Sequence, residues 1–241
     1  MRNLLLLSSS REGSSGYLEH AQPIIEQFLG NVSPNAFDNA LFIPFAGVTI
    51  GFDDYYETVK KALSSINVQL SSIHTADDPA IAIKKASAII IGGGNTFHLL
   101  HQLYQFDLIG LIRERVMNGV PYIGWSAGSN IASPSIMTTN DMPIIQPPSF
   151  HALQLVSFQI NPHYLDQHPP GFNGETREQR LNEFLTVNPD ATVLGLPEGS
   201  GLQITNEQAS LVGDKTVYQF DAKGKSELSN DSEQLKHLLA D

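Results

Sequence analysis

The sequence PYIGWSAGSNIA at residues 121–132 joins a short apolar run to a stretch of small residues, with glycines on both sides of a serine. Its central part, GWSAG at residues 124–128, matches the G-x-S-x-G pattern of a nucleophile elbow. Such a turn needs glycines because the backbone closes tightly around the serine. The stretch therefore predicts a strand at Pro121–Trp125, a helix after it, and the Ser126 hydroxyl at the carboxyl end of a sheet.

Short apolar runs alternate with longer amphipathic stretches over most of the chain. This alternation is typical of βαβ units around a mostly parallel sheet. The expected strands are Leu4–Leu7, Leu41–Pro44, Val68–Ile73, Ala88–Ile91, Pro121–Trp125, Phe158–Ile160 and Val193–Leu196. The expected helices are Tyr17–Leu29, Asp53–Ser65, Pro79–Ala86, Thr96–Gln105, Leu108–Asn118 and Glu175–Val187.

Near the C-terminus the rhythm changes to short strands with turn residues between them. The runs Leu202–Thr205, Ala209–Val212 and Thr216–Phe220 predict antiparallel hairpins at one edge, followed by a helix near Ser232–Leu239. We therefore expect one α/β domain over residues 1–241. It should have three layers around a mostly parallel sheet with an antiparallel edge near the C-terminus.

Composition excludes several classes of protein. The 241 residues carry 14 Lys and Arg against 25 Asp and Glu, a formal net charge of −11, which argues against nucleic acid and anionic membranes as partners. No apolar run approaches the roughly 18 residues that a membrane span needs, so a soluble, cytoplasmic protein is expected. The chain has no cysteine, which excludes disulfides, thiolate metal sites and a cysteine nucleophile.

A second glycine-rich junction, GGGNTF at residues 92–97, follows the apolar strand Ala88–Ile91. Its amides should lie at the same sheet edge as Ser126, because the carboxyl ends of parallel strands meet there. We expect an amide at Gly93 or Gly94, together with the amide of Ala127, to hold an oxyanion. A dinucleotide or phosphate loop is the weaker alternative, since neither G-x-G-x-x-G nor a Walker lysine is present.

A serine nucleophile needs a base, and the sequence offers eight histidines. His163 follows a strand-like run and is the preferred base, with His168 in reserve. Glu198, at the end of the next apolar run, is expected to orient the imidazole, and Asp141 is its rival. We expect these groups to meet at one rim of the sheet. His98 and His101 share a helix face, but packing is favoured over metal binding there because no third ligand is evident.

The order Ser126, His163, Glu198 differs from that of α/β-hydrolases and parallels the Cys-His-Glu order of class I glutamine amidotransferase-like domains. This resemblance implies a flavodoxin-like sheet. The chain further resembles the peptidase E group of the S51 serine peptidases. This resemblance rests on the segments Ile43–Val48, Gly92–Phe97, Tyr122–Asn130, Thr138–Pro143, Ile160–His163, Gly174–Arg180 and Leu196–Gly199. It implies hydrolysis of dipeptides with an N-terminal aspartate, with Ser126 as nucleophile, His163 as base and Glu198 as orienting acid.

An acidic substrate needs a local cation in a protein with a net charge of −11. Screening acts over ~8 Å at physiological salt, so a guanidinium in contact with the substrate outweighs distant surface charges. The resemblance favours Arg177 as this cation, while an exposed Arg177 paired with Glu178 or Glu183 is the alternative. Asp141 is the candidate for the substrate amine, and Asn95 is also assigned to substrate binding.

Two other functions remain open. The same fold could act as a cyanophycinase-like hydrolase of β-aspartyl-arginine polymers, or as a non-catalytic small-molecule binding protein in which GWSAG is only a tight turn. A glutaminase is excluded because there is no thiol nucleophile. We expect neither a metal nor another cofactor. The sequence permits a homodimer without indicating one.

Overall fold

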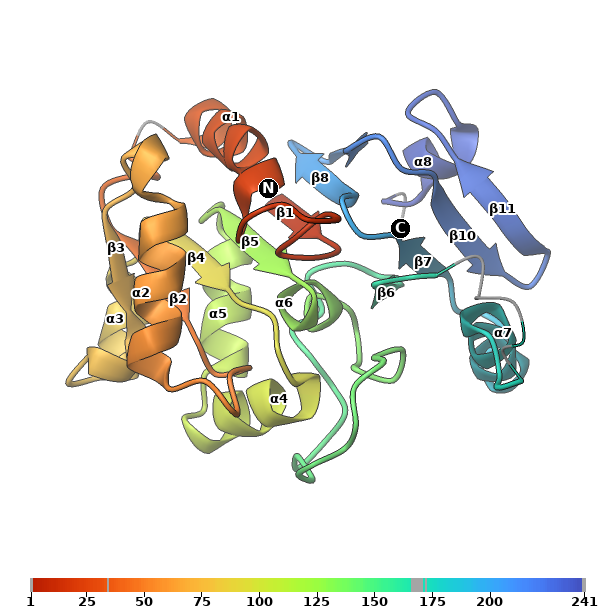
Figure 1. Ribbon diagram of the computed structural model, residues 1–241, viewed down its shortest axis with the longest axis horizontal. Helices are drawn as coiled ribbons and strands as arrows, with labels where there is room; N and C mark the ends of the chain where they lie inside the picture. Colours follow the sequence, from red (N-terminus) through yellow and green to blue (C-terminus); the bar gives the residue numbers. More distant parts are fainter. Residues whose placement is uncertain (1, 34, 166–170, 172, 240–241) are drawn as a thin grey trace.

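The computed structural model describes residues 2–33, 35–165, 171 and 173–239. One part of it is a sheet of seven strands (Figure 1). In spatial order the strands are β3 (Leu70–Ser72), β2 (Ala40–Ile43), β4 (Ala88–Ile91), β5 (Tyr122–Trp125), β1 (Asn3–Leu7), β8 (Gly201–Thr205) and β9 (Gln208–Val212). The first five strands run parallel to one another, whereas β8 pairs antiparallel with β1 and β9 pairs antiparallel with β8. This confirms the expected mostly parallel sheet with an antiparallel edge.

A second sheet of four strands lies beside the first (Figure 1). Its order is β11 (Gly224–Leu228), β10 (Val217–Asp221), β7 (Val193–Leu196) and β6 (Gln159–Pro162). The expectation of one continuous sheet was therefore wrong. β10, predicted as part of the first sheet's edge, pairs instead with β7 and β11. The polar sequence GKSEL of β11 gave no strand signal, because only its last residue is buried.

Eight α-helices and three short 3₁₀ helices complete the described chain. The α-helices are α1 (Gln22–Val32), α2 (Phe52–Ala62), α3 (Pro79–Lys85), α4 (Thr96–Gln105), α5 (Ile109–Met117), α6 (Ala127–Asn130), α7 (Arg177–Val187) and α8 (Glu233–His237). The 3₁₀ helices are η1 (Glu19–Ala21), η2 (Ser64–Ile66) and η3 (Ile73–Thr75). The predicted helices are all present with small shifts at their ends, and η3 replaces the end of the strand expected at Val68–Ile73.

The helices cover both faces of the first sheet, as the apolar runs of its central strands require. Alternate residues of β1 show the division: Leu5 and Leu7 pack in a core with α1 and α2, whereas Leu4 and Leu6 pack in a core with α3, α4 and α5. That second core continues into the smaller sheet through β6 and β7. α7 packs on the opposite face of the smaller sheet. The three predicted layers are therefore present.

The two sheets are joined by buried and half-buried polar side chains along β6, which is an edge strand. Asn130, at the end of α6, donates from Nδ2 to the carbonyl of Ile160 (2.7 Å), and the Thr138 hydroxyl donates to the same oxygen (2.9 Å). Asn140 Nδ2 donates to the carbonyl of Pro162 (2.7 Å). Because buried backbone groups need partners, these bonds fix β6 against α6, which itself begins at the end of β5.

Ser8 makes a second connection at the carboxyl end of β1. Its hydroxyl, which is fully buried, donates to the carbonyl of Leu196 (2.7 Å) at the end of β7 and accepts from the backbone amide of His163 (2.9 Å) just after β6. One hydroxyl therefore ties the first sheet to two strands of the second.

No helix within the described residues is long and apolar enough to cross a lipid bilayer.

Replacing Ser8 by Ala should lower the free energy of unfolding by about 1–3 kcal/mol, because the half-buried amide of His163 and the buried end of β7 would lose their hydrogen bonds to the Ser8 hydroxyl. Urea denaturation measures this change. Ser229→Ala, at an exposed position near the C-terminus, is the matched control and should stay within about 0.5 kcal/mol of the parent. Equal stability of the two variants would contradict the role of Ser8 in joining the sheets.

Candidate active site

Ser126 sits on a strained turn between β5 and α6. Its φ of 53° and ψ of −114° lie outside the regions favoured by side-chain-bearing residues, as expected for a nucleophile elbow. The flanking glycines are required by close contacts. A Cβ on Gly124 would lie 2.3 Å from the carbonyl oxygen of Gly128, and a Cβ on Gly128 would lie 2.1 Å from that of Ile91. The predicted elbow is therefore present, packed against β4.

The structure brings Ser126, His163 and Glu198 together. Ser126 Oγ lies 2.9 Å from His163 Nε2, and His163 Nδ1 lies 2.8 Å from Glu198 Oε1. The expected single rim is corrected here: Ser126 follows β5 of the first sheet, whereas the other two follow β6 and β7 of the second. The His163 side chain is 38% exposed and that of Glu198 57% exposed, so the relay opens to solvent.

The other acidic candidate, Asp141, does not contact His163. Its Oδ2 accepts hydrogen bonds from the backbone amide of Thr96 (2.7 Å), the hydroxyl of Thr96 (2.6 Å) and the hydroxyl of Thr139 (3.2 Å). Asp141 is therefore held at the N-terminus of α4, where the helix dipole favours a negative charge. Of the two rivals, only Glu198 reaches the imidazole.

Gly93 and Gly94 lie against the elbow, as the sequence predicted. A Cβ on Gly93 would come within 2.9 Å of Ser126 Cβ, and one on Gly94, whose φ is 137°, within 2.2 Å of the carbonyl oxygen of Ala46. Within the described chain, the amides of Gly93, Gly94 and Ala127 donate no hydrogen bond to a protein group. Donors of this kind beside a serine hydroxyl are what an oxyanion requires.

Tyr55 holds the glycine loop in place, and sequence reasoning missed it. Its hydroxyl donates to the carbonyl of Gly93 (2.8 Å) and accepts from Tyr17 (3.1 Å), whose own hydroxyl accepts from Trp125 Nε1 (3.1 Å). Burial, and secondarily Tyr17, raises the pKa of Tyr55 well above its usual value, so the hydroxyl keeps its proton. A Cβ on Gly92 would meet Tyr55 Oη at 2.2 Å, which explains that glycine.

An open cavity of about 830 Å³ lies over Ser126. Ser126, His163, Gly93, Gly94, Asn95 and Asp141 line it together with aromatic and aliphatic side chains. Asn95 has its side chain engaged already: Oδ1 accepts from the amide of His98 (3.0 Å) as the cap of α4, and Nδ2 donates to the carbonyl of Met142 (2.8 Å). Its expected contact with substrate stays a prediction.

Arg177 lines a neighbouring hollow of about 230 Å³ rather than the cavity over Ser126. Asp141 lines both, so the two spaces share a wall. The alternative pairing with Glu178 or Glu183 is not formed within the described residues, and Glu178 Oε2 instead lies 3.2 Å from Lys225 Nζ. Burial and the nearby Arg180 lower the pKa of the Arg177 guanidinium, and Asp141 opposes them. Within the described residues Arg177 has no ion-pair partner.

The other histidines that the structure describes take no part in this arrangement. Nδ1 of His98 lies 2.7 Å from the carbonyl oxygen of Phe45, and Nδ1 of His101 lies 3.3 Å from that of Gln146, so both contact backbone as expected. No group of three His, Asp or Glu side chains among the described residues could hold a metal ion. His168, the reserve base, lies outside the described residues.

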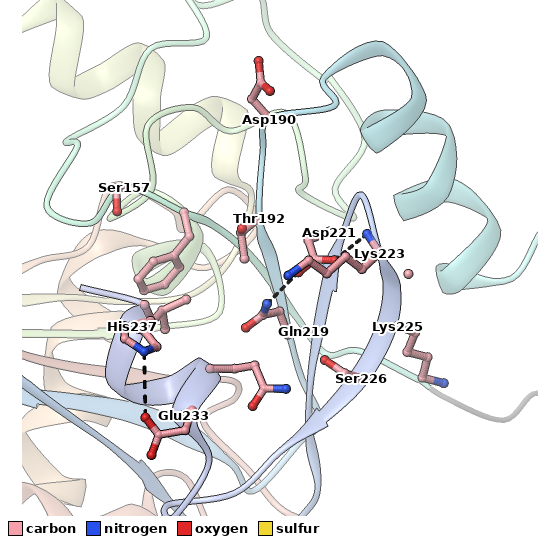
Figure 2. Close-up of a pocket in the computed structure, with 14 residues that line it drawn as sticks. Ser157, Asp190, Thr192, Gln219, Asp221, Lys223, Lys225, Ser226, Glu233 and His237 are labelled. Atoms are coloured by element: carbon pink, nitrogen blue, oxygen red, sulfur yellow. Dashed lines mark hydrogen bonds and ion pairs between the residues drawn. The ribbon is translucent and has the colours of Figure 1, made fainter. Parts of the chain in front are cut away.

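A separate cavity of about 660 Å³ lies near the C-terminal strands (Figure 2). Figure 2 shows two contacts between its lining side chains: Gln219 Nε2 donates to Asp221 Oδ2 (2.9 Å), and Glu233 Oε2 lies 3.8 Å from His237 Nε2. Within the described chain, the lining serines make no hydrogen bond to His237. This cavity therefore lacks the nucleophile and base that meet over Ser126.

Residues 4–212 match the model of peptidase family S51. Peptidase E of Shewanella sp. strain MR-4 is 52% identical over 237 residues, covering 98% of each chain. The chain belongs to peptidase family S51. This confirms the predicted family and enzyme class, a serine peptidase. A second S51 relative, peptidase E of Shewanella baltica strain OS195, is 54% identical over 218 residues, covering 90% of this chain and 89% of the relative.

Solved structures confirm the fold of this S51 peptidase. A peptidase from an acI-B1 actinobacterium gives a TM-score of 0.68 at 17% identity, covering 96% of each chain. A protein from Listeria monocytogenes EGD-e gives a TM-score of 0.64 at 25% identity, covering 89% of this chain and all of the other. The predicted α/β architecture is therefore shared with peptidases of distant sequence.

Replacing Gly128 by Ala should lower the free energy of unfolding by about 3 kcal/mol or more, because the new Cβ would clash with the backbone of β4. Gly30→Ala is the matched control: nothing lies within 4 Å of its added Cβ in α1, and it should stabilise by about 0.5–1 kcal/mol. Urea denaturation compares them. If Gly128→Ala unfolds at the parent's urea concentration, the close contact is not present.

Proposed function

We propose that this S51 peptidase is an aspartyl dipeptidase, which cleaves dipeptides with an N-terminal aspartate through Ser126, His163 and Glu198. The observation that carries the proposal is the chain of contacts from Ser126 Oγ to His163 Nε2 (2.9 Å) and from His163 Nδ1 to Glu198 Oε1 (2.8 Å). Full-length similarity to proteins named peptidase E supports the choice of substrate class.

In the first half-reaction, His163 Nε2 takes the proton of Ser126 Oγ while that oxygen attacks the peptide carbonyl carbon. The amides of Ala127 and of the Gly93–Gly94 turn receive the oxyanion, and one donor of this kind contributes ~2.7–4 kcal/mol. Glu198 accepts a hydrogen bond from Nδ1 and stabilises the imidazolium. His163 then gives its proton to the leaving amine, and an aspartyl ester remains on Ser126.

In the second half-reaction, a water molecule gives its proton to the same imidazole and attacks the ester. The tetrahedral intermediate returns to the same donors, and its collapse releases aspartate and restores the Ser126 hydroxyl. The His163 side chain is 38% exposed, so the site is open to water.

We assign selection of the substrate to the wall that the cavity over Ser126 shares with the neighbouring hollow. Arg177 has no carboxylate partner among the described residues, and its planar guanidinium can bind the aspartate side chain in a bidentate pair. Asp141 lines both spaces, which suits it to the substrate's α-ammonium group. The hydrogen bonds from Thr96 and Thr139 keep its carboxylate fixed.

Ser126→Ala should fold normally and lose hydrolysis of Asp-Leu by about 10⁴-fold or more, since the attacking oxygen is removed. Release of leucine measures the rate. A fluorophosphonate probe should label the parent at Ser126 and leave the variant unlabelled. Full turnover by the variant would remove the proposed nucleophile; absence of labelling in the parent would favour a binding protein, and cleavage of β-aspartyl-arginine alone would favour the cyanophycinase-like reaction.

Arg177→Gln should raise KM for Asp-Leu by about 10- to 100-fold, because a charge-assisted pair with the side-chain carboxylate is lost. Preference for Asp-Leu over its neutral analogue Asn-Leu should fall by the same factor. Arg113→Gln, which removes an exposed cation from α5, is the control and should behave like the parent. If the Arg177 variant still discriminates between Asp-Leu and Asn-Leu as the parent does, another group binds the aspartate side-chain carboxylate.

A further inference from the structure

Arg11, in the loop after β1, is the only lysine or arginine among the described residues that line the cavity over Ser126. Aspartate recognition was assigned above to Arg177, which lines the neighbouring hollow instead. The cavity itself therefore has a cation with no role in the proposed reaction.

The charge of Arg11 has no carboxylate partner within the described chain. Its Nη1 donates to the backbone carbonyl of Ser15 (3.0 Å), which uses one of the five N–H groups of a guanidinium. The adjacent Glu12 does not neutralise it, because Glu12 Oε1 lies 2.9 Å from Lys215 Nζ. The guanidinium thus keeps its charge and most of its donors available to a ligand.

The guanidinium is also held in position. Its carbon lies 5.9 Å from the centre of the Tyr17 ring, a cation–π distance, and the Ser9 hydroxyl donates to the backbone carbonyl of Arg11 (2.7 Å). Tyr17 in turn accepts from Nε1 of Trp125, the neighbour of Ser126. Tyr17 therefore links Arg11 to Trp125, which precedes Ser126 in the elbow.

The loop that carries Arg11 starts beside the backbone of His163. Ser8, three residues earlier, binds the backbone amide of His163, the group assigned to protonate the leaving amine. The leaving residue of a substrate must lie on that side of Ser126. The neighbouring cavity wall is largely apolar, with Tyr17, Val48 and Ile50 in it. An apolar wall suits a neutral side chain, which leaves the terminal carboxylate as the partner for Arg11.

We propose that Arg11 binds the free α-carboxylate of the leaving residue and so makes the enzyme prefer dipeptides over longer peptides. The inference rests on the proposed dipeptidase function. A peptide that continues past its second residue has a neutral amide at this place, which cannot form the ion pair. Arg177 and Arg11 would then hold the two carboxylates of Asp-X from separate spaces, which counters the net charge of −11 locally.

The test compares Asp-Leu with Asp-leucinamide, which differ only in the terminal charge. The parent should prefer Asp-Leu in kcat/KM by about tenfold or more. Arg11→Gln should bring that ratio close to one, mainly by raising KM for Asp-Leu, and Arg11→Lys should restore part of it. Arg113→Gln again serves as control and should keep the parent ratio. A parent without preference, or a preference that survives in Arg11→Gln, would overturn the proposal.

A binding measurement separates this proposal from the proposed function. In a Ser126→Ala background, calorimetry should give a lower Kd for Asp-Leu than for Asp-leucinamide, and adding Arg11→Gln should remove the difference. If the parent hydrolyses neither compound, the dipeptidase function fails, but these Kd values still decide the subsite. Equal Kd values in the Ser126→Ala protein, or no binding of either compound, would overturn the proposed role of Arg11.

Discussion

The candidate site depends on how β6 is held against the first sheet. β6 is an edge strand, so its outward backbone groups have no strand to pair with, and side chains of Asn130, Thr138 and Asn140 satisfy them instead. These bonds leave little freedom between the sheets, because breaking any of them would strand a buried polar group. The 2.9 Å contact between Ser126 and His163 is a consequence of that junction.

The close packing around the same junction explains why three residues near the site are glycines. Gly92, Gly93 and Gly94 each face a different neighbour, namely Tyr55, the Ser126 side chain and the backbone of Ala46. Tyr55 fills the space over Gly92 and binds the carbonyl of Gly93, so the loop has one conformation in which its amides remain unused. Donors held before the reaction starts need no reorganisation during it, which is where an oxyanion site gains most of its effect.

The charge around the candidate site differs from the net charge of the chain. The chain has a surplus of acidic residues, yet arginines without a carboxylate partner in the described structure occur at the two spaces next to Asp141. Two other basic residues are paired with carboxylates, Lys215 with Glu12 and Lys225 with Glu178. Such a pattern gives an acidic ligand attractive contacts at short range, where screening by salt is weakest.

The sequence by itself determined the strands β4 and β7, the elbow at Ser126, and the order of serine, histidine and glutamate, because these depend on local periodicity and on glycines beside one residue. Only the tertiary structure decided that the strands divide into two sheets, since β11 is polar and its pairing with β10 is not encoded in any apolar pattern. Tyr55 and Arg11 belong to the site for the same reason. They come from segments far from Ser126 in the chain, and only the packing of α2 and of the loop after β1 at the ends of the strands brings them to it.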